Sequence, residues 1–233
     1  MNAAGLPTTA VRWELTAPVA SFRDPLFPAV QLGLPFPPPS TVRGLLAACV
    51  GGYDRLADVA DARTAFAYTF TSADEDTDLE TWHPVLAVGA KSPAEPKPAL
   101  RAVLIDAHLT LWVLCDDPGR WERRLRRPVW PLRLGRSQDL ATPTRPVTVP
   151  LTRADDAAQG AAVVPDTGGV AADGRRYRVT THVAAPTRRA EWGACVYQPD
   201  ARHRDHRVTD SDAQILADND QFVAPWPLQP ATP

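Results

Sequence analysis

The sequence predicts an α+β domain that combines short strands with two helices. Apolar and polar residues alternate at 11–17, the period of a strand with one buried face, and apolar residues recur with helical spacing at 42–50. Further strand-like segments follow this helix. With 233 residues the chain is long enough for one main domain, and its 25 prolines indicate many loops and chain reversals.

The first helix is expected directly after a proline-rich approach. Val11–Ala17 forms the first strand, and the prolines of Leu34–Ser40 remove amide donors, which favours an extended chain. Ser40 suits the N-cap position of a helix. Val42–Val50 carries the apolar face of that helix, and Gly51–Gly52 supplies its stop.

The middle of the chain predicts three strands around a polar insertion. Thr64–Phe70 is rich in threonine and aromatic residues and is typical of a strand. Residues 71–98 are polar and rich in acids at first, which indicates an insertion or a long hairpin. Two further strands are expected at Leu100–Leu104 and Leu109–Cys115, with a bend near Asp106.

A second, basic helix is expected from Asp117 to Pro128. Asp117 suits the cap, the following proline suits the first helical position, and Pro128 ends the helix. Trp121 and Leu125 share its inner side. Its outer side carries Arg120, Arg123, Arg124, Arg126 and Arg127. This helix either is a solvated outer face or meets RNA or DNA.

The last strand of this domain is expected at Val129–Leu134, before the loop Gly135–Asp139. The resulting order, strand, helix, strand, strand, helix, strand, is the ferredoxin-like (RRM-like) βαββαβ plan that RNA-recognition modules share. We therefore assign residues 11–140 to one such domain with a hairpin insertion at about 71–98.

The rest of the chain predicts a β-rich extension over 141–224. Residues 154–174 have the composition of a loop, Tyr177–Val183 alternates as a strand, and Trp192–Tyr197 is its expected partner. A Pro-rich tail at 225–233 is expected to be extended or disordered.

Composition excludes several classes of protein. A net charge of -2 argues against a uniformly basic nucleic-acid binder, although two basic blocks at 86–153 and 175–207 could follow a phosphate backbone. The start lacks a basic segment followed by an apolar core, and the apolar run Leu109–Cys115 is too short to span a bilayer, so we expect a cytoplasmic protein with no membrane contact. The three cysteines, Cys49, Cys115 and Cys195, are widely separated and predict neither a disulfide framework nor a zinc ribbon.

Candidate catalytic and metal-binding groups are scattered. Ribonuclease chemistry needs a base and an acid, and the available groups are Tyr53, His83, Lys91 and His108. His203-Arg-Asp-His206, near Cys195 and Asp210, imitates a metal site, but a surface loop is the better interpretation because no second ligand pair has matching spacing. We expect no metal, no cofactor and no catalytic residue.

Three segments carry a resemblance to a known family. Ala20–Pro25, Leu34–Leu46 and Pro131–Leu140 are similar, in order and spacing, to the signatures of CRISPR-associated protein family five of the RAMP superfamily. The resemblance covers about residues 11–140. It implies a ferredoxin-like body with a protruding thumb, which by position is residues 71–98.

The resemblance also implies a function and partners. Members cap the 5′ handle of the guide RNA (crRNA) in type I Cascade surveillance complexes, contact the backbone subunit and the large subunit, and meet target DNA indirectly through the complex. We expect a non-catalytic RNA-binding subunit for antiviral defence. The alternative is a metal-independent endoribonuclease that processes precursor crRNA, because one subtype of the family does so.

The expected RNA-binding residues lie in or beside the matching motifs, on the thumb and in the Gly135–Asp139 loop. They are Arg23, Ser40, Arg43, Lys91, Lys97, Arg101, Arg133, Arg136, Ser137 and Gln138. Guanidinium groups hold phosphates bidentately and stack on splayed bases. Three alternatives stay open: Ser40 serves only as a helix cap, Arg136 pairs with Asp139 to close its loop, and the thumb residues Lys91, Lys97 and Arg101 belong to an ordinary solvated hairpin.

Overall fold

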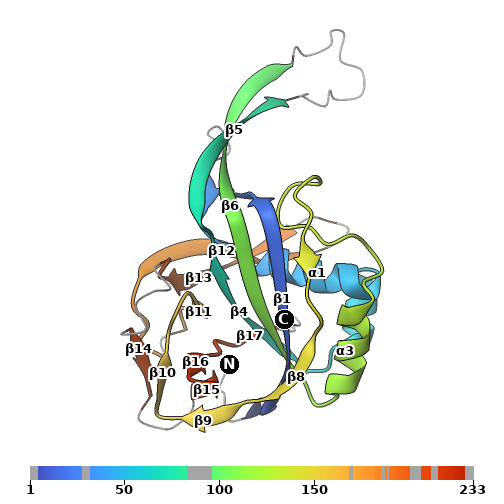
Figure 1. Ribbon diagram of the computed structural model, residues 1–233, viewed down its shortest axis with the longest axis vertical. Helices are drawn as coiled ribbons and strands as arrows, with labels where there is room; N and C mark the ends of the chain where they lie inside the picture. Colours follow the sequence, from blue (N-terminus) through green and yellow to red (C-terminus); the bar gives the residue numbers. More distant parts are fainter. Residues whose placement is uncertain are drawn as a thin grey trace.

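The computed structural model describes residues 5–27, 32–82, 96–167, 170–184, 187, 189–199, 206–210 and 215–228. A twisted sheet lies at the centre, with helices on one side and the C-terminal strands on the other (Figure 1). A two-stranded hairpin projects from the sheet (Figure 1). No helix in these ranges is both long and apolar enough to cross a membrane.

The central sheet has the strand order β17-β4-β6-β1-β7, with β5 paired to β6 and β8 to β1. Its strands are β1 (Thr9–Ala20), β4 (Ala65–Thr71), β5 (Asp74–Trp82), β6 (Lys97–Leu114), β7 (Thr142–Pro143), β8 (Val147–Pro150) and β17 (Trp226–Pro227). The strands predicted at 11–17 and 64–70 are therefore confirmed as β1 and β4. The two strands predicted at 100–104 and 109–115 form one, β6, with the expected irregularity at Asp106, whose φ is 51°.

The two faces of this sheet are covered by different parts of the chain. Val11, Trp13 and Leu15 of β1 pack in a cluster with the apolar face of the first helix. Of the residues that alternate with them, Ala10 lies in a cluster with Leu216 and other buried residues and Arg12 pairs with Asp218, whereas Glu14 is exposed. Because close-packed residues cover both of its faces, the sheet is a rigid base for the side chains on the helices and loops.

The described residues form three helices, α1 (Pro39–Val50), α2 (Tyr53–Val59) and α3 (Pro118–Arg126). Helix α1 is the predicted one, but its N-cap is Pro38, so the expectation that Ser40 caps the helix is wrong. Helix α2 was not predicted. In α3 the Asp117 side chain accepts a hydrogen bond from the Arg120 amide at 3.0 Å, which confirms the predicted cap.

The strand predicted at Val129–Leu134 is absent. The amides of Val129 and Trp130 instead donate to the carbonyls of Cys49 and Ala48 in the last turn of α1, at 3.4 and 3.1 Å. Prolines on both sides of Trp130 remove amides that a sheet would need. β7 and β8, which come later in the chain, pair with β1 instead.

The projecting hairpin corresponds to the insertion predicted at 71–98. β5 pairs antiparallel with the first half of β6, from Asp74 opposite Ile105 to Trp82 opposite Lys97. Residues 83–95, which connect the two strands, lie outside the described ranges. Because β6 continues without a break into the central sheet, the hairpin is an extension of the sheet itself. We call this hairpin, β5 with 97–105 of β6, the thumb.

The C-terminal region forms small sheets packed against the core. Its strands are β9 (Thr152–Ala154), β10 (Asp156–Ala158), β11 (Val163–Pro165), β12 (Arg175–Ala184), β13 (Arg189–Tyr197), β14 (Arg207–Thr209), β15 (Ile215–Asp218) and β16 (Gln221–Phe222). A short pair, β2 (Phe22–Arg23) and β3 (Gly33–Leu34), lies before α1. The predicted pairing of 177–183 with 192–197 is confirmed, with Tyr177 opposite Cys195. The expectation of a loop over 154–174 is wrong, since β10 and β11 lie within it.

The first part of the expected Pro-rich tail is built into the structure. Trp226 pairs with Phe66 of β4 and its indole Nε1 donates to the Val163 carbonyl at 2.9 Å. Residues 229–233 lie outside the described ranges.

Candidate nucleic-acid interface

A groove runs along α1 beside the segment that follows α3. It encloses about 430 Å³. It is lined by Ser40, Thr41, Gly44, Leu45, Ala48, Tyr53, Trp130, Pro131, Arg133 and Gly135. We call it the α1 groove. Its walls come from three separate stretches of sequence, α1, the start of α2 and residues 130–135, so the groove exists only in the folded chain.

Two aromatic side chains in this groove are open to solvent. Trp130 is 52% exposed and Tyr53 is 37% exposed. The hydrogen bond from the Trp130 amide to Ala48 fixes one, and the other lies against a glycine, since the Tyr53 hydroxyl is 3.2 Å from where a Cβ at Gly44 would stand. Large aromatic residues held at the surface by their backbones offer flat apolar faces to a ligand.

Cationic and polar groups flank these rings. Arg133 is exposed in the groove, and its backbone is held by a bridge to Leu140. Ser40 lies in the first turn of α1, where its hydroxyl shares a 2.7 Å hydrogen bond with the Thr180 hydroxyl of β12. No side chain caps α1, so the positive end of its dipole is not neutralised by a capping oxygen.

The Gly135–Asp139 loop is closed by its own residues and by the backbone of Ser21. Gly135 has a φ of 117°, and a Cβ there would stand 2.1 Å from the Ser21 carbonyl oxygen, so only glycine fits. The Ser21 amide donates to the Leu134 carbonyl at 3.2 Å. Ser137 and Gln138 are exposed at the tip of the loop.

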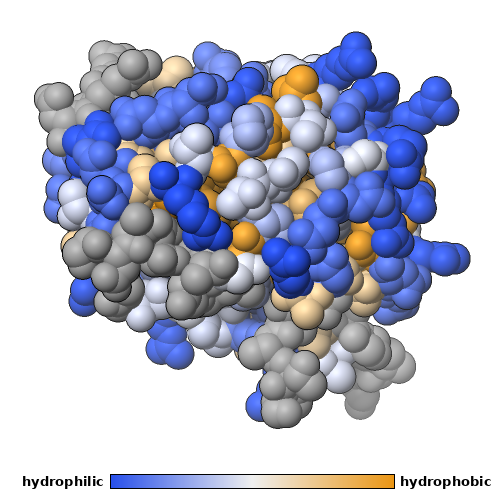
Figure 2. Space-filling model, turned by 90° about the horizontal axis from the view of Figure 1, so that it is seen from below, coloured by the Kyte–Doolittle hydropathy of each residue, from blue (hydrophilic) through white to orange (hydrophobic). Residues whose placement is uncertain are grey.

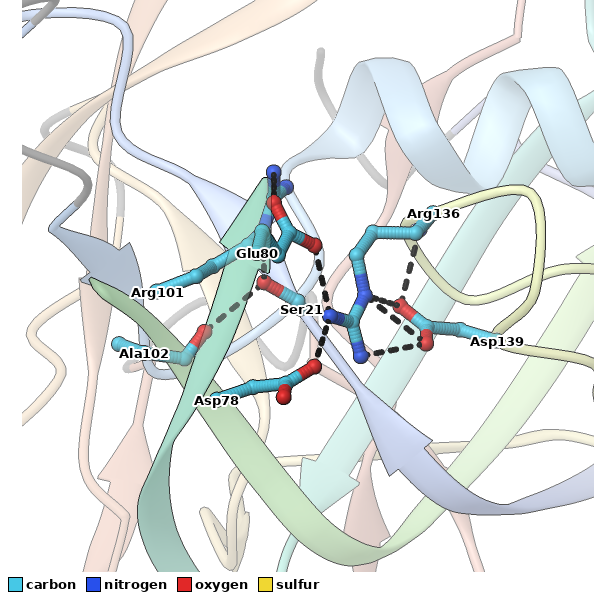
Figure 3. A network of polar contacts seen from close by, with 7 residues as sticks. All are labelled: Ser21, Asp78, Glu80, Arg101, Ala102, Arg136 and Asp139. Carbon is cyan, nitrogen blue, oxygen red and sulfur yellow. Dashed lines mark hydrogen bonds and ion pairs between the residues drawn. The ribbon is translucent and has the colours of Figure 1, made fainter. Parts of the chain in front are cut away.

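Arg136 is bound to carboxylates on two sides (Figure 3). Its Nε and Nη2 donate to Asp139 at 3.0 to 3.1 Å, and its Nη1 reaches Asp78 at 2.6 Å and Glu80 at 2.7 Å on the thumb. The side chain is only 9% exposed. The pKa of Arg136 is raised, first by the hydrogen bond to Asp139, and the Arg136 guanidinium lowers the pKa of Asp78.

Arg101 extends the same network along the thumb. It donates to the Ser21 hydroxyl at 2.7 Å and to Glu80 at 3.3 Å, while Ser21 donates to the Ala102 carbonyl at 2.8 Å (Figure 3). We call Ser21, Asp78, Glu80, Arg101, Arg136 and Asp139 the Arg136 network. Of the two roles considered for Arg136, the structure contains the pairing with Asp139, extended to the thumb.

The other predicted RNA-binding residues are dispersed. Arg43 is 4% exposed, and burial lowers its pKa to about 10, although Glu191 and Tyr53 act in the opposite direction. In this arrangement Arg43 has almost no surface that a phosphate could reach. Arg23 is half-buried in β2. Lys97 begins β6, but its side chain, like the whole of Lys91, lies outside what the structure describes.

The fold places two possible acid-base groups side by side, Tyr53 and His182, whose proximity was not predicted from the sequence. The rings of Tyr53 and His182 pack edge to face with centroids 6.4 Å apart. Burial and the charge of Arg43 lower the pKa of His182, and burial raises that of Tyr53. His108 instead pairs with Asp106 at 3.4 Å, and His83 lies outside the described residues.

The expected absence of a metal site concerns a region that is only partly described. Within the described ranges, no three His, Cys, Asp or Glu side chains gather in a group that could hold a metal ion. His203 lies outside these ranges, and His206 pairs with Asp173 at 3.1 Å. The thiols of Cys49, Cys115 and Cys195 are buried and free.

Sequence reasoning missed Trp130, which it assigned to a strand. The signal was present, because prolines at 128 and 131 bracket the residue and argue for a loop. It also missed His182 as a neighbour of Tyr53, and no local signal could have joined two residues from α2 and β12.

Comparison with known proteins identifies the family. Residues 10–215 match the family model described as CRISPR-associated protein (Cas_Cas5). No curated protein matches the chain.

Solved structures show similar folds. A chain of a CRISPR RNA-guided surveillance complex is 16% identical with a TM-score of 0.57, covering 88% of this chain and 92% of that one. A chain of the type III-B Cmr-beta bound to cognate target RNA and AMPPnP is 10% identical with a TM-score of 0.51, covering 84% and 86%. A CRISPR protein from Archaeoglobus fulgidus is 12% identical with a TM-score of 0.49, covering 91% and 97%. Since the family model spans most of the sequence, the chain belongs to the CRISPR-associated Cas_Cas5 family.

Proposed function

We propose that this chain is a non-catalytic, crRNA-binding subunit of a type I CRISPR Cascade complex and that the α1 groove holds the 5′ handle. The observation that carries the proposal is the exposure of Trp130 and Tyr53 beside Arg133 in one groove. Single-stranded RNA is recognised by stacking of its unpaired bases on aromatic and guanidinium planes. The groove offers both kinds of surface within a few residues of each other.

The backbone of the handle has its own partners in the same groove. Arg133 supplies a fork of donors for a phosphate, and the uncapped first turn of α1 supplies the Ser40 amide and a positive dipole, since Pro39 has no amide hydrogen and the Thr41 amide donates to the Pro38 carbonyl. Ser40 stands at this turn, although its hydroxyl is shared with Thr180. In this assignment Arg133 and the α1 start position the phosphates, and the two aromatic rings hold the bases.

We also assign a ferredoxin-like plan to the core, with the β7–β8 segment as its fourth strand. The order β4-β6-β1-β7, with α1 after β1 and α3 after β6, supports this assignment. The thumb would then meet the backbone subunit of the complex, while other surfaces meet the large subunit. The fold shared with a chain of an RNA-guided surveillance complex supports such an assembly.

The test of the groove is a stacking variant. Trp130→Ala should weaken retention of a labelled 5′-handle RNA by about 5- to 150-fold, because base-aromatic stacking contributes about 1–3 kcal/mol per base. The control is Val147→Ala, an apolar truncation at a residue that is 47% exposed on β8 and does not line the groove. Handle binding that Trp130→Ala leaves unchanged, in the free chain and in the assembled complex, would remove the groove from the proposal.

One observation favours a second function, the metal-independent endoribonuclease. A neutral His182 can act as a base, and Tyr53 lies beside it. The Nδ1 of His182 is buried without a partner among the described residues, which leaves only Nε2 for a substrate. A tyrosine whose pKa is raised by burial is a poor acid for the leaving oxygen, and for this reason we favour the non-catalytic role.

Cleavage assays separate the two functions. We expect labelled repeat RNA to stay intact with this chain, with and without divalent metal. Specific cleavage that is lost in Tyr53→Phe or in His182→Gln, while the variant still folds, would establish the nuclease instead.

A further inference from the structure

A stripe of arginines on α3 has no role in the proposed handle site. Arg120, Arg123, Arg124 and Arg127 stand at i, i+3, i+4 and i+7, so they share one side of the helix and continue past its last turn. All four are exposed, whereas Trp121 and Leu125 are buried on the other side. Hydrophilic side chains project along the right-hand edge in Figure 2, the side on which α3 lies in Figure 1.

These cations are poorly compensated within the protein. Arg120 donates to the Asp58 carbonyl oxygen at 2.9 Å, and Arg126, which lies off the stripe, pairs with Glu122. Among the described residues, the guanidiniums of Arg123, Arg124 and Arg127 have no carboxylate within ion-pair distance. Like charges at i+3 and i+4 destabilise a helix, and Arg120 lies in the first turn, where the dipole disfavours a cation, although the dipole favours Arg123 and Arg124 in the last turn. An external polyanion would relieve both effects.

The surface around the stripe is concave and forms a site separate from the α1 groove. Arg120, Arg123, Arg124 and Arg127 line a depression of about 470 Å³. A second depression of about 270 Å³ adds Arg55 of α2 and one acid, Asp58. No residue in the described part of the chain lines both the α1 groove and either depression. The two depressions share Arg120 and Arg124, so five arginines line two neighbouring depressions.

We propose that this α3 stripe binds the phosphate backbone of double-stranded DNA directly. Charge complementarity selects a polyanion. Among the described residues, no aromatic side chain lines either depression, which favours a ligand whose bases are already stacked inside a duplex. The stripe from Arg120 to Arg127 rises about 10 Å along the helix, which is comparable to the width of about 12 Å of the B-DNA major groove and lets its ends reach phosphates on both sides, whereas the A-form RNA major groove is narrow. The contacts are to phosphates and therefore independent of base sequence.

Salt dependence of binding tests this proposal. If four arginines each neutralise one phosphate, the slope of log K against log salt for a short mixed-sequence DNA duplex is about -3.6, a loss of about 150-fold between about 50 and about 200 mM salt. The variant Arg123→Gln/Arg127→Gln removes two contacts, so its slope should flatten to about -1.8. Its affinity should then decrease only about 12-fold over the same range of salt. The control Arg176→Gln/Arg189→Gln removes the same net charge from exposed positions on β12 and β13 and should keep the parent slope.

Other ligands and the control variant test whether the α3 stripe binds DNA specifically. Handle RNA binding should be unchanged in Arg123→Gln/Arg127→Gln, which separates this site from the α1 groove. An equal loss of slope in the control pair would show that only net charge matters and would overturn the proposal. Tighter, stripe-dependent binding of an RNA duplex, a single strand or polyglutamate than of the DNA duplex would assign the surface to that ligand instead.

Discussion

Replacing Arg136 should damage the fold rather than the RNA site. In Arg136→Ala the Asp139 carboxylate, which is 2% exposed, loses its guanidinium partner. It keeps the hydrogen bond from the backbone amide of residue 136, which is 3.0 Å long in the parent. Removing one partner of a buried ion pair costs about 3–5 kcal/mol of stability. The ion pairs to the thumb carboxylates contribute less stability, because water reaches Asp78. We therefore expect a loss of about 3 kcal/mol, or about 6–12 °C in melting temperature for a chain of this size.

Companion variants separate the possible causes. Arg136→Lys should recover only part of the loss, because one ammonium reaches either Asp139 or the thumb and not both. Asp139→Asn and the double variant complete a cycle whose coupling should be about 1–3 kcal/mol. Arg189→Ala, at an exposed position on β13, should change stability by no more than about 0.5 kcal/mol.

Thermal denaturation and handle binding are measured on the same samples. A melting temperature for Arg136→Ala within about 1 °C of the parent would refute the structural role. If that stable variant also lost the handle, the guanidinium would face RNA, and the network in Figure 3 would be replaced when RNA binds.

Three further perturbations follow from the structure. Gly135→Ala should cost more than about 2 kcal/mol, because its φ of 117° and the Ser21 carbonyl both exclude a Cβ; a variant that melts like the parent would contradict this. Because the pKa of His182 is lowered in the fold, the unfolded chain binds more protons as the pH falls below about 6.5, so stability should decrease from pH 7 to pH 5, and less so in His182→Gln. Burial raises the pKa of all three thiols to about 12, so a thiol reagent should label them only after denaturation; rapid labelling of the native chain would show that a cysteine is exposed.

Elements with a complete local pattern were predictable. Helix α1 has apolar residues at helical spacing and a glycine stop, and α3 has an aspartate cap followed by proline, so no distant partner was needed to place them. Val129–Leu134 failed because its apolar content suggested a strand, while its prolines and its bonds to α1 keep it off the sheet.

The candidate site was only partly within reach of sequence reasoning. Arg133 was predicted from the family motif, and it does line the groove. Arg136 was ambiguous, since its deciding partners, Asp78 and Glu80, stand 58 and 56 residues earlier on the thumb. Single-sequence patterns report local periodicity and give no information about which distant acid meets which base.

The short strand β17 has a consequence for how the protein is made. It pairs with β4, which is synthesised long before it, and its Trp226 side chain closes over Val163. Until the ribosome has released residues 226–227, the Ala65–Phe66 end of the outer edge of β4 lacks its partner and presents unpaired backbone groups to other chains, whereas the Phe70 amide can already donate to the Ala161 carbonyl. Contacts between such distant segments also form slowly, so the newly made chain has an extended period of exposure to aggregation. Partial chains that end before β17 should therefore be recovered mainly as aggregates, and the yield of soluble protein should depend on chaperones that shield this edge.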